Sequence, residues 1–374
     1  MTLRPLASLL LFVTLLLAAP ASAWSYKEHV MMTRLAAHRI LQDESAPEDL
    51  KTWLRANVPE AENITDIRDF AIDTRVGPSV DTLSRLSYWG VHPDTKRNTQ
   101  VPLFGSNEGK MHFIDLEFFN PDPAKRTYQL DGSGKPVAAD VPRDKTNRTY
   151  IDAGYLPLRV EQCYDEFVKS VAAKRLEGDD SSEALDNAVA WGGYLAHYLQ
   201  DNTQPHHATA DYKSEAYFPG TGYKPNVHGM MEYGFLDDEE MAYPDLRQAY
   251  YEGVIEQLDA MDAADFGDPF ATTLDISLDA YNSLPLIGEA AVAAVEAGSA
   301  REPDLRVFAT HVGSNGETVL DVKTRQAALA VLRTEAAWRQ AWAEANGDFK
   351  LADDQRTPGV SKPTTAPANP PAVK

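Results

Sequence analysis

Apolar residues recur at helical spacing along most of this chain. In the segment 28–41, for example, Val30, Leu35, Ala36 and Ile40 fall on one face of a helix. The same kind of spacing predicts further helices at 156–176, 182–199, 241–261, 269–297 and 321–345. Because these segments dominate the chain, we expect an all-α fold made of many helices in a single domain.

Two segments lack this periodicity. Residues 98–150 are rich in Gly, Pro, Asn and Asp, and we expect loops there, with a short hairpin near residues 130–134. Residues 209–227 form a second irregular connection. Long loops that border a cluster of chemically active residues commonly form pocket walls. We therefore expect long irregular loops around a cleft.

The two ends of the chain differ from the region between them. Residues 1–23 carry Arg4, then an apolar stretch, then the small-residue cleavage site Ala21-Ser22-Ala23, which together predict a secretory signal peptide. An uncleaved membrane anchor is the alternative, but the apolar stretch is short for a membrane span. Residues 351–374 contain five prolines, which predicts an extended, disordered tail. One domain at 24–350, in a secreted or periplasmic protein, is therefore expected.

The chain is strongly acidic. Its formal net charge is −21, and loss of Arg4 with residues 1–23 takes this to −22. At long range such a charge repels nucleic acid and anionic membranes and affects small or zwitterionic substrates less, although a cationic metal site can override it locally. Cys163 is the one cysteine, so an intramolecular disulfide is excluded and we expect this side chain in the core.

Three residues of types that bind metals occur within eleven positions: His197, Asp201 and His207. His197 and Asp201 are four residues apart, so they share one face of a helix. Pro205 ends or kinks that helix, which lets His207 approach from a new direction. His206 competes with His207 for this role.

His228 and Glu232 repeat the four-residue spacing further along the chain. Two helix faces that each present an imidazole and a carboxylate, together with a histidine from a turn, form a potential ligand cluster. Imidazole and carboxylate ligands in combination suit zinc. The spacing therefore predicts a zinc site.

Other segments extend this pattern toward the N-terminus. Cleavage after residue 23 would make Trp24 the first mature residue, and a free α-amine with its own carbonyl oxygen can chelate a metal. The ordered motifs are Trp24…His29, Ala71-Ile72-Asp73, Met111-His112-Phe113-Ile114-Asp115, His197…Asp201…His207 and His228…Glu232. This series resembles the trinuclear zinc phosphodiesterases, a superfamily that holds the bacterial zinc-dependent phospholipases C and the single-strand-specific zinc nucleases.

The resemblance implies three Zn²⁺ ions and a ligand set for each. The residues that resemble the ligands of the first ion are Asp73, His112, His197 and Asp201. Those that resemble the ligands of the second, more open ion are His207, His228 and Glu232. Those that resemble the ligands of the third are Trp24, His29 and Asp201, so Asp201 would bridge two ions.

The resemblance also implies a hydrolase. A water activated by zinc would attack the phosphorus of a phosphodiester, and the ions would stabilise the charge on the phosphoryl oxygens. Asp73 would act as a ligand or as a general base. Asp115 resembles a catalytic carboxylate near the site, and an ordinary capping or surface carboxylate is the alternative for it.

Two groups of features disagree about the substrate. The short spacing from Trp24 to His29 and the sequence at 112–115 resemble the nuclease branch, whereas Glu232 and the stretch 208–214 resemble the phospholipase branch. We favour a phospholipase C-like enzyme acting on a phospholipid head group, with single-stranded DNA or RNA as the alternative substrate. Six aromatic residues could line a lipid site, although core packing is the simpler role for them: Tyr88, Trp89, Phe104, Phe113, Phe118 and Phe119.

A different class of protein is also consistent with the sequence. A non-catalytic, zinc-stabilised interaction protein would contain similar ligands, but it would not need an open metal position. No stable protein partner is predicted, and we expect a monomer.

Overall fold

The computed structural model describes residues 24–71, 81–89, 108–137, 140–176, 182–220, 222–236, 243–262 and 265–346. These residues form a mainly helical fold, so the all-α prediction is confirmed. Within them there is no β-sheet, and strand-like pairing is confined to two isolated antiparallel bridges, Leu130–Pro136 and Val312–Thr318. The first bridge closes a turn where the hairpin was expected.

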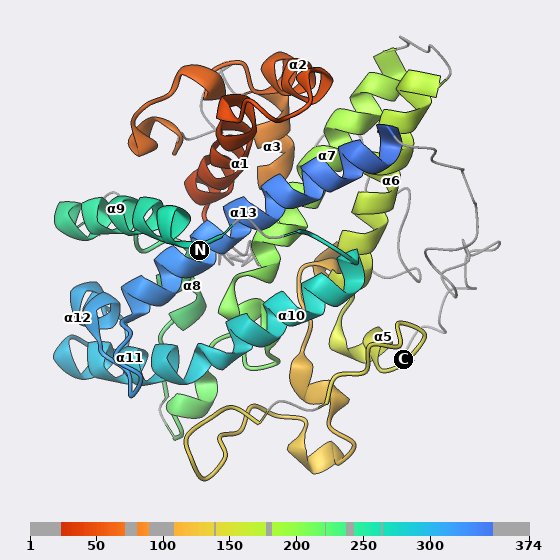
Figure 1. Ribbon diagram of the computed structural model, residues 1–374. Helices are drawn as coiled ribbons and strands as arrows, with labels where there is room; N and C mark the ends of the chain where they lie inside the picture. The colour runs from red at the N-terminus through yellow and green to blue at the C-terminus, as the bar shows by residue number, and fades with distance from the viewer. Residues whose placement is uncertain are drawn as a thin grey trace, which may run out of the picture.

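The longest helix, α13 (Val319–Asn346), crosses the middle of the helix assembly (Figure 1). It contacts four other long helices, which are α1 (Tyr26–Gln42), α6 (Leu156–Leu176), α7 (Ser182–Asn202) and α9 (Pro244–Ala260). Trp338 and Trp342 of α13 are buried, and the rings of both pack against Trp53. A helix that is surrounded in this way forms the centre of the hydrophobic core.

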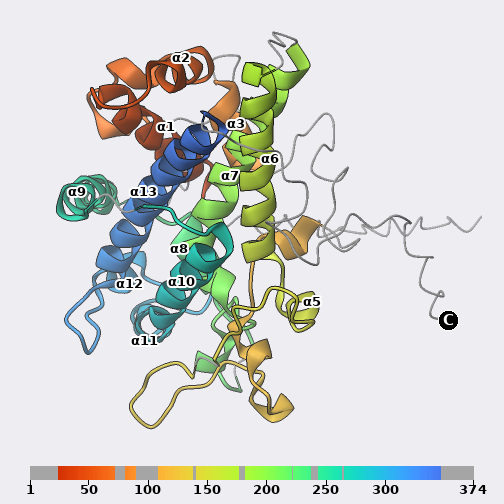
Figure 2. The same cartoon turned by 45° about the vertical axis from the view of Figure 1, so that its right-hand side comes forward.

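Helices α6 and α7 pack along each other, as Figure 2 shows. The observed bounds of α6 are those predicted from the sequence, and α7 continues three residues beyond the predicted end. Cys163, expected in the core, lies in α6 and is buried. Helix α7 ends at Asn202, shortly before Pro205. Pro205 then begins a 3-10 turn, η6 (Pro205–Ala208), which redirects the chain as predicted.

The segment 269–297 was predicted as one helix, and this prediction is wrong. The structure has two helices there, α10 (Pro269–Asn282) and α11 (Leu284–Ala297), which meet at Ser283. Pro285, in the first turn of α11, has no N–H with which to continue the hydrogen bonds of α10.

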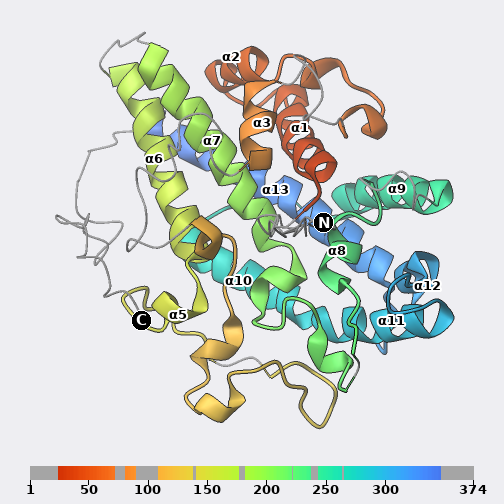
Figure 3. The same cartoon turned by 180° about the vertical axis from the view of Figure 1, so that it is seen from behind.

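Several shorter elements were not predicted. They are α2 (Glu48–Asn57), α3 (Thr82–Trp89), α5 (Tyr150–Ala153), α12 (Leu305–Thr310), and the 3-10 turns η1 (Ala61–Asn63), η2 (Ile67–Asp69), η3 (Glu108–Met111), η4 (Leu116–Phe119), η5 (Pro123–Lys125) and η7 (Glu215–Tyr217). Helix α8 (Val227–Glu232) is the short helix on which His228 and Glu232 were expected to share a face. Figure 3 shows α8 near the place where α7 ends and α1 begins.

Two close backbone approaches set the positions of segments that matter below. A Cβ atom on Gly193 of α7 would lie 2.5 Å from Cβ of Leu86, so α3 packs tightly on α7 at this point. Gly154 has a φ of +113°, and a Cβ atom there would meet the carbonyl oxygen of Phe113 at 2.3 Å. Only glycine allows either arrangement without displacement of the neighbouring segment.

The described residues contain no helix that combines the length and the apolar composition needed to cross a membrane. The predicted signal peptide at 1–23 and the predicted tail at 351–374 lie outside the described residues.

Candidate metal centre

The structure brings His29, His197 and Asp201 together at the junction of α1 and α7. One ligand atom from each lies within 4.8 Å of the others, and all three residues are buried. His29 comes from the first turn of α1, whereas His197 and Asp201 lie one helical turn apart on α7. Three converging imidazole and carboxylate ligands can hold a metal ion.

Asp201 presents its two carboxylate oxygens in different directions. Oδ1 lies 3.4 Å from Nε2 of His29, whereas Oδ2 lies 2.6 Å from Nδ1 of His112 and 3.2 Å from Nε2 of His197. Nδ1 of His112 is also 3.1 Å from Nε2 of His197. The two oxygens therefore contact different histidines, as a carboxylate that bridges two ions would.

A second group consists of His207, His228 and Glu232. One ligand atom from each lies within 4.8 Å of the others, and all three side chains are buried. His207 comes from η6, and α8 supplies the other two, with Nε2 of His228 2.7 Å from Oε1 of Glu232. Nε2 of both histidines and this carboxylate oxygen are buried, and beyond the ion-pair contact between His228 and Glu232 they make no hydrogen bond with the described residues. Buried polar atoms normally have partners, so this group could hold a metal ion.

Three of the histidines have one ring nitrogen fixed by an oxygen acceptor. Nδ1 of His29 donates to the side-chain oxygen of Gln200 at 2.6 Å, and Nδ1 of His197 donates to the carbonyl oxygen of Ser87 at 2.7 Å. Nδ1 of His207 donates to the carbonyl oxygen of His112. Each bond leaves the lone pair of Nε2 available toward its group, which is how proteins orient histidine ligands for metals.

Burial also keeps these ligands in the protonation states that metal binding requires. Desolvation lowers the pKa of His29 to about 3, helped by the nearby His197, and desolvation lowers the pKa of His207 to about 3. Burial acts to raise the pKa of Asp201, but His197 and His112 outweigh it and hold that pKa well below its usual range. Neutral imidazoles around an ionised carboxylate are the forms that coordinate a cation.

The structure brings predicted ligands of two ions into one group. His29 and His197 were assigned to separate ions, yet their rings stack with centroids 4.7 Å apart and both reach the same group. Trp24 is buried beside them, and its indole nitrogen donates to the carbonyl oxygen of Gln200 at 2.7 Å. Asp73, the remaining predicted ligand of the first ion, lies outside the described residues.

Asp115, predicted as a carboxylate near the site, belongs to neither of the two groups. Burial raises the pKa of this carboxyl to about 7, with a further contribution from Glu117, and Lys110 opposes the shift. No ligand histidine contributes to that shift. Asp115 begins the 3-10 turn η4 without a capping hydrogen bond from its side chain.

His206, the competitor of His207, belongs to neither of the two groups. Its Nε2 lies 3.1 Å from Oγ of Ser214, and its ring stacks on that of His228 with centroids 5.3 Å apart. Ser214 is the one described non-glycine residue with a positive φ, at 53°. His206 therefore supports both His228 and a strained turn at 211–214 next to the second group.

Sequence reasoning missed the side chains that hold the ligands. Gln200 orients His29 and also donates to Thr33. Glu117 is buried and accepts from the hydroxyl of Thr209 and the N–H of Ala210, which fixes the chain just after His207. The position of Gln200 between His197 and Asp201 was a usable signal for it, whereas nothing in the local sequence marks Glu117.

The predicted aromatic residues give a mixed outcome. Phe119 is buried against Tyr150, and Phe118 packs partly buried against the core, so core packing accounts for these two. Phe113 is partly buried. The side chains of Tyr88 and Trp89, and the whole of Phe104, lie outside the described residues.

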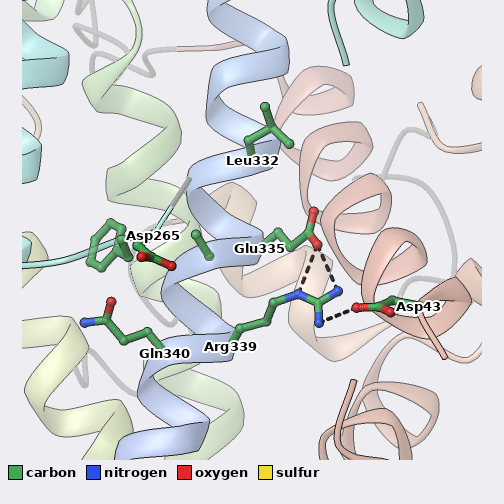
Figure 4. Close-up of a pocket in the computed structure, with 8 residues that line it drawn as sticks. Asp43, Asp265, Leu332, Glu335, Arg339 and Gln340 are labelled. Carbon is green, nitrogen blue, oxygen red and sulfur yellow. Dashed lines mark hydrogen bonds and ion pairs between the residues drawn. The ribbon is translucent and has the colours of Figure 1, made fainter. Parts of the chain in front are cut away.

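A cavity of about 480 Å³ lies apart from the two groups, where α1 ends against α13. Figure 4 shows Arg339 between Glu335 and Asp43. Its guanidinium lies 2.9 Å from a carboxylate oxygen of each. Asp43 follows α1 about 20 Å along that helix from His29. Asp43, Glu335 and Arg339 bind one another at this cavity, and neither ligand group lines it, so the two ligand groups remain the candidate functional site.

Comparison with models of known protein families gave no match, and comparison with curated proteins also gave no match. The resemblance to the trinuclear zinc phosphodiesterases therefore rests on the motifs in this sequence. The fold and the site together define a mainly helical protein with two buried groups that could hold metal ions.

Proposed function

We propose that this chain is a secreted zinc-dependent phosphodiesterase. One observation carries the proposal: two buried ligand groups are adjacent, and each is built from histidines and a carboxylate. His112 connects them, because its Nδ1 contacts Asp201 while its carbonyl oxygen accepts from His207. Closely spaced metal ions held in this way are typical of enzymes that hydrolyse phosphate esters.

The chemistry that bound zinc supplies here is Lewis-acid chemistry, which acidifies water and neutralises charge on a phosphodiester. The residues of the chain supply the orientation. Gln200 and the carbonyl oxygens of Ser87 and His112 hold the Nδ1 protons of the three histidines, so that their Nε2 atoms face the groups. In a chain with a net charge of −21, local cations are also needed to attract an anionic substrate.

We propose three zinc ions, with Trp24 and Asp73 completing the ligand set. Support for Trp24 comes from its burial next to Gln200, which in turn holds His29. A mature chain that begins at Trp24 would place its α-amine in this region. This part of the proposal therefore depends on removal of residues 1–23 during secretion.

The favoured substrate is a phospholipid head-group phosphodiester, on the basis of Glu232 and the stretch 208–214. One observation favours a single-stranded nucleic acid as the second candidate. Tyr212 is 48% exposed, and its ring centroid is 6.1 Å from that of His228. The ammonium of Lys213 lies 5.2 Å from the Tyr212 ring. An exposed ring with an adjacent cation suits a stacked base and a further phosphate, and it disfavours a cationic head group.

The test compares two substrates, a chromogenic phosphocholine ester and single-stranded DNA, each with and without a chelator. His228→Ala removes a ligand of the second group and should lower activity on the true substrate at least about 100-fold. His38→Ala is the matched control, because His38 bonds to the carbonyl oxygen of Ala61 at 2.7 Å and belongs to neither ligand group. Cleavage of neither substrate would refute the enzyme, and cleavage of DNA alone would refute the phospholipase preference.

A further inference from the structure

A buried lysine on α13 lies between the two ligand groups. Lys323 and Glu28 are both fully buried, and Nζ of Lys323 is 2.7 Å from Oε1 of Glu28. The same ammonium donates to the carbonyl oxygen of Met231. Glu28 immediately precedes the proposed ligand His29, and Met231 immediately precedes the proposed ligand Glu232. The Lys323 side chain therefore contacts a residue next in sequence to a ligand of each group.

Aromatic rings surround the same ammonium. Its nitrogen lies 4.6 Å from the ring centroid of Trp24, 4.9 Å from that of Phe235 and 5.3 Å from that of Tyr250. A lysine is desolvated only at a high cost, and these rings with one carboxylate and one carbonyl oxygen replace its water. An apolar residue would fill this space at lower cost, so fold stability alone does not explain a charged pair here.

The pair also fixes the start of the described chain. Oε2 of Glu28 accepts from the N–H of Ser25 at 3.1 Å, while Oγ of Ser25 accepts from the N–H of Glu28 at 3.3 Å. This reciprocal capping box fixes the direction in which the chain runs from Trp24 into α1. Lys323 binds the other oxygen of the same carboxylate, so it ties this first turn to α13.

We propose that Lys323 is a positioning residue for the metal centre, which holds the first turn of α1 and the last turn of α8 in register so that both groups converge. It acts through Glu28 and Met231, and its one contact with a proposed ligand is with the indole ring of Trp24, not with the amine or carbonyl group that would bind metal. The inference requires that the two groups bind metal, but it does not depend on the substrate.

The experiment measures zinc binding rather than activity. In Lys323→Met, Glu28 would remain as an uncompensated buried charge, and the fold could fail for that reason alone. The double variant Lys323→Met with Glu28→Gln removes both charges, and glutamine still closes the capping box. We expect this double variant to melt within a few degrees of the parent in the presence of chelator.

The zinc affinity of the double variant should fall about 10- to 100-fold, measured by titration against a competing chelator. The matched control is Lys145→Met with Glu161→Gln, which removes a lysine–glutamate pair elsewhere in the fold and should leave zinc affinity unchanged. The Co²⁺-loaded double variant should also show an altered absorption spectrum.

The outcomes separate the two proposals. If the parent protein binds no zinc, the proposed metal centre is wrong. If the parent binds zinc and the double variant binds it equally well, the role of Lys323 is refuted. Failure of the double variant to fold would also overturn the inference, because it would show that the pair supports the fold rather than the ligands.

Discussion

The contact of α7 with α3 at Gly193 gives a prediction about the metal centre from a residue that has no side chain to act as a ligand. In Gly193→Ala the new Cβ would lie 2.5 Å from Cβ of Leu86 and 3.2 Å from the carbonyl oxygen of Leu83. Carbon atoms in contact are normally about 3.5–4.0 Å apart. Because Cβ of Leu86 is next to the backbone, a rotamer change cannot relieve the clash, and α3 must move by about 1 Å.

That movement reaches a ligand. The carbonyl oxygen of Ser87, in the same helix as Leu86, accepts from Nδ1 of His197 at 2.7 Å. A displacement of about 1 Å away from α7 lengthens this distance to about 3.7 Å, which is beyond hydrogen-bonding range. His197 then loses its fixed orientation, and we expect zinc affinity to fall about 10- to 100-fold.

Overall stability should change less than zinc affinity. Overpacking costs about 1–3 kcal/mol, whereas replacing glycine by alanine within a helix contributes about 1 kcal/mol of stability. The net loss is therefore about 0–2 kcal/mol, seen as a drop of a few degrees in the melting temperature with chelator present.

Gly192→Ala is the matched control for this experiment. Its Cβ would meet the far edge of the Trp53 ring at 3.0 Å and the far edge of the Phe167 ring at 3.2 Å. These rings belong to α2 and α6, so the clash does not involve α3. It should lower the melting temperature without weakening zinc binding. Equal zinc affinities for Gly193→Ala and the parent, measured by chelator competition, would refute the link between the α3–α7 contact and His197.

Three other perturbations have defined outcomes. Chelation should lower the melting temperature by about 5 °C or more, with recovery on adding Zn²⁺ in excess; a scanning melt that shows no shift would contradict metal binding to the native state. A chain that keeps one residue before Trp24 should bind one zinc ion fewer than a chain that begins there, and equal counts by elemental analysis would contradict the role of its α-amine. The folded-state pKa of Asp115 is raised to about 7 by burial and by Glu117, above its unfolded value, so its ionisation costs stability as pH rises from about 4 to 7. Asp115→Asn should therefore stabilise the protein more at pH 8 than at pH 5 in urea unfolding, and an equal effect at both pH values would contradict the shift.

The spacing of apolar residues predicted the long helices that pack through one continuous apolar face. Helix α6 has the predicted bounds, because apolar residues keep their spacing over its whole length. The segment 269–297 keeps the same spacing through Ser283, so periodicity alone could not detect the break that Pro285 introduces. Helix α3 escaped notice because it is short, and its position depends on Gly193 of another helix.

The candidate site was partly predictable for a similar reason. His228 and Glu232 are four residues apart on one helix, so their spacing in the sequence is also their spacing in space. The partners that orient the ligands come from distant segments: the Ser87 carbonyl lies 110 residues from His197, and the His112 carbonyl lies 95 residues from His207. A backbone carbonyl is present at every residue, so no residue type marks the ones that serve as acceptors.

The ion pair between Glu28 and Lys323 joins the two ends of the described chain. Trp24 contacts Gln200 across 176 residues, and the next turn of the chain contacts α13, near the other end. Contacts of such long sequence separation form late, because a large loop must close before they gain any energy. If the two groups bind zinc as proposed, a chain that is still being synthesised lacks a complete metal centre, because α13 must be in place before the first turn of α1 is held by Lys323.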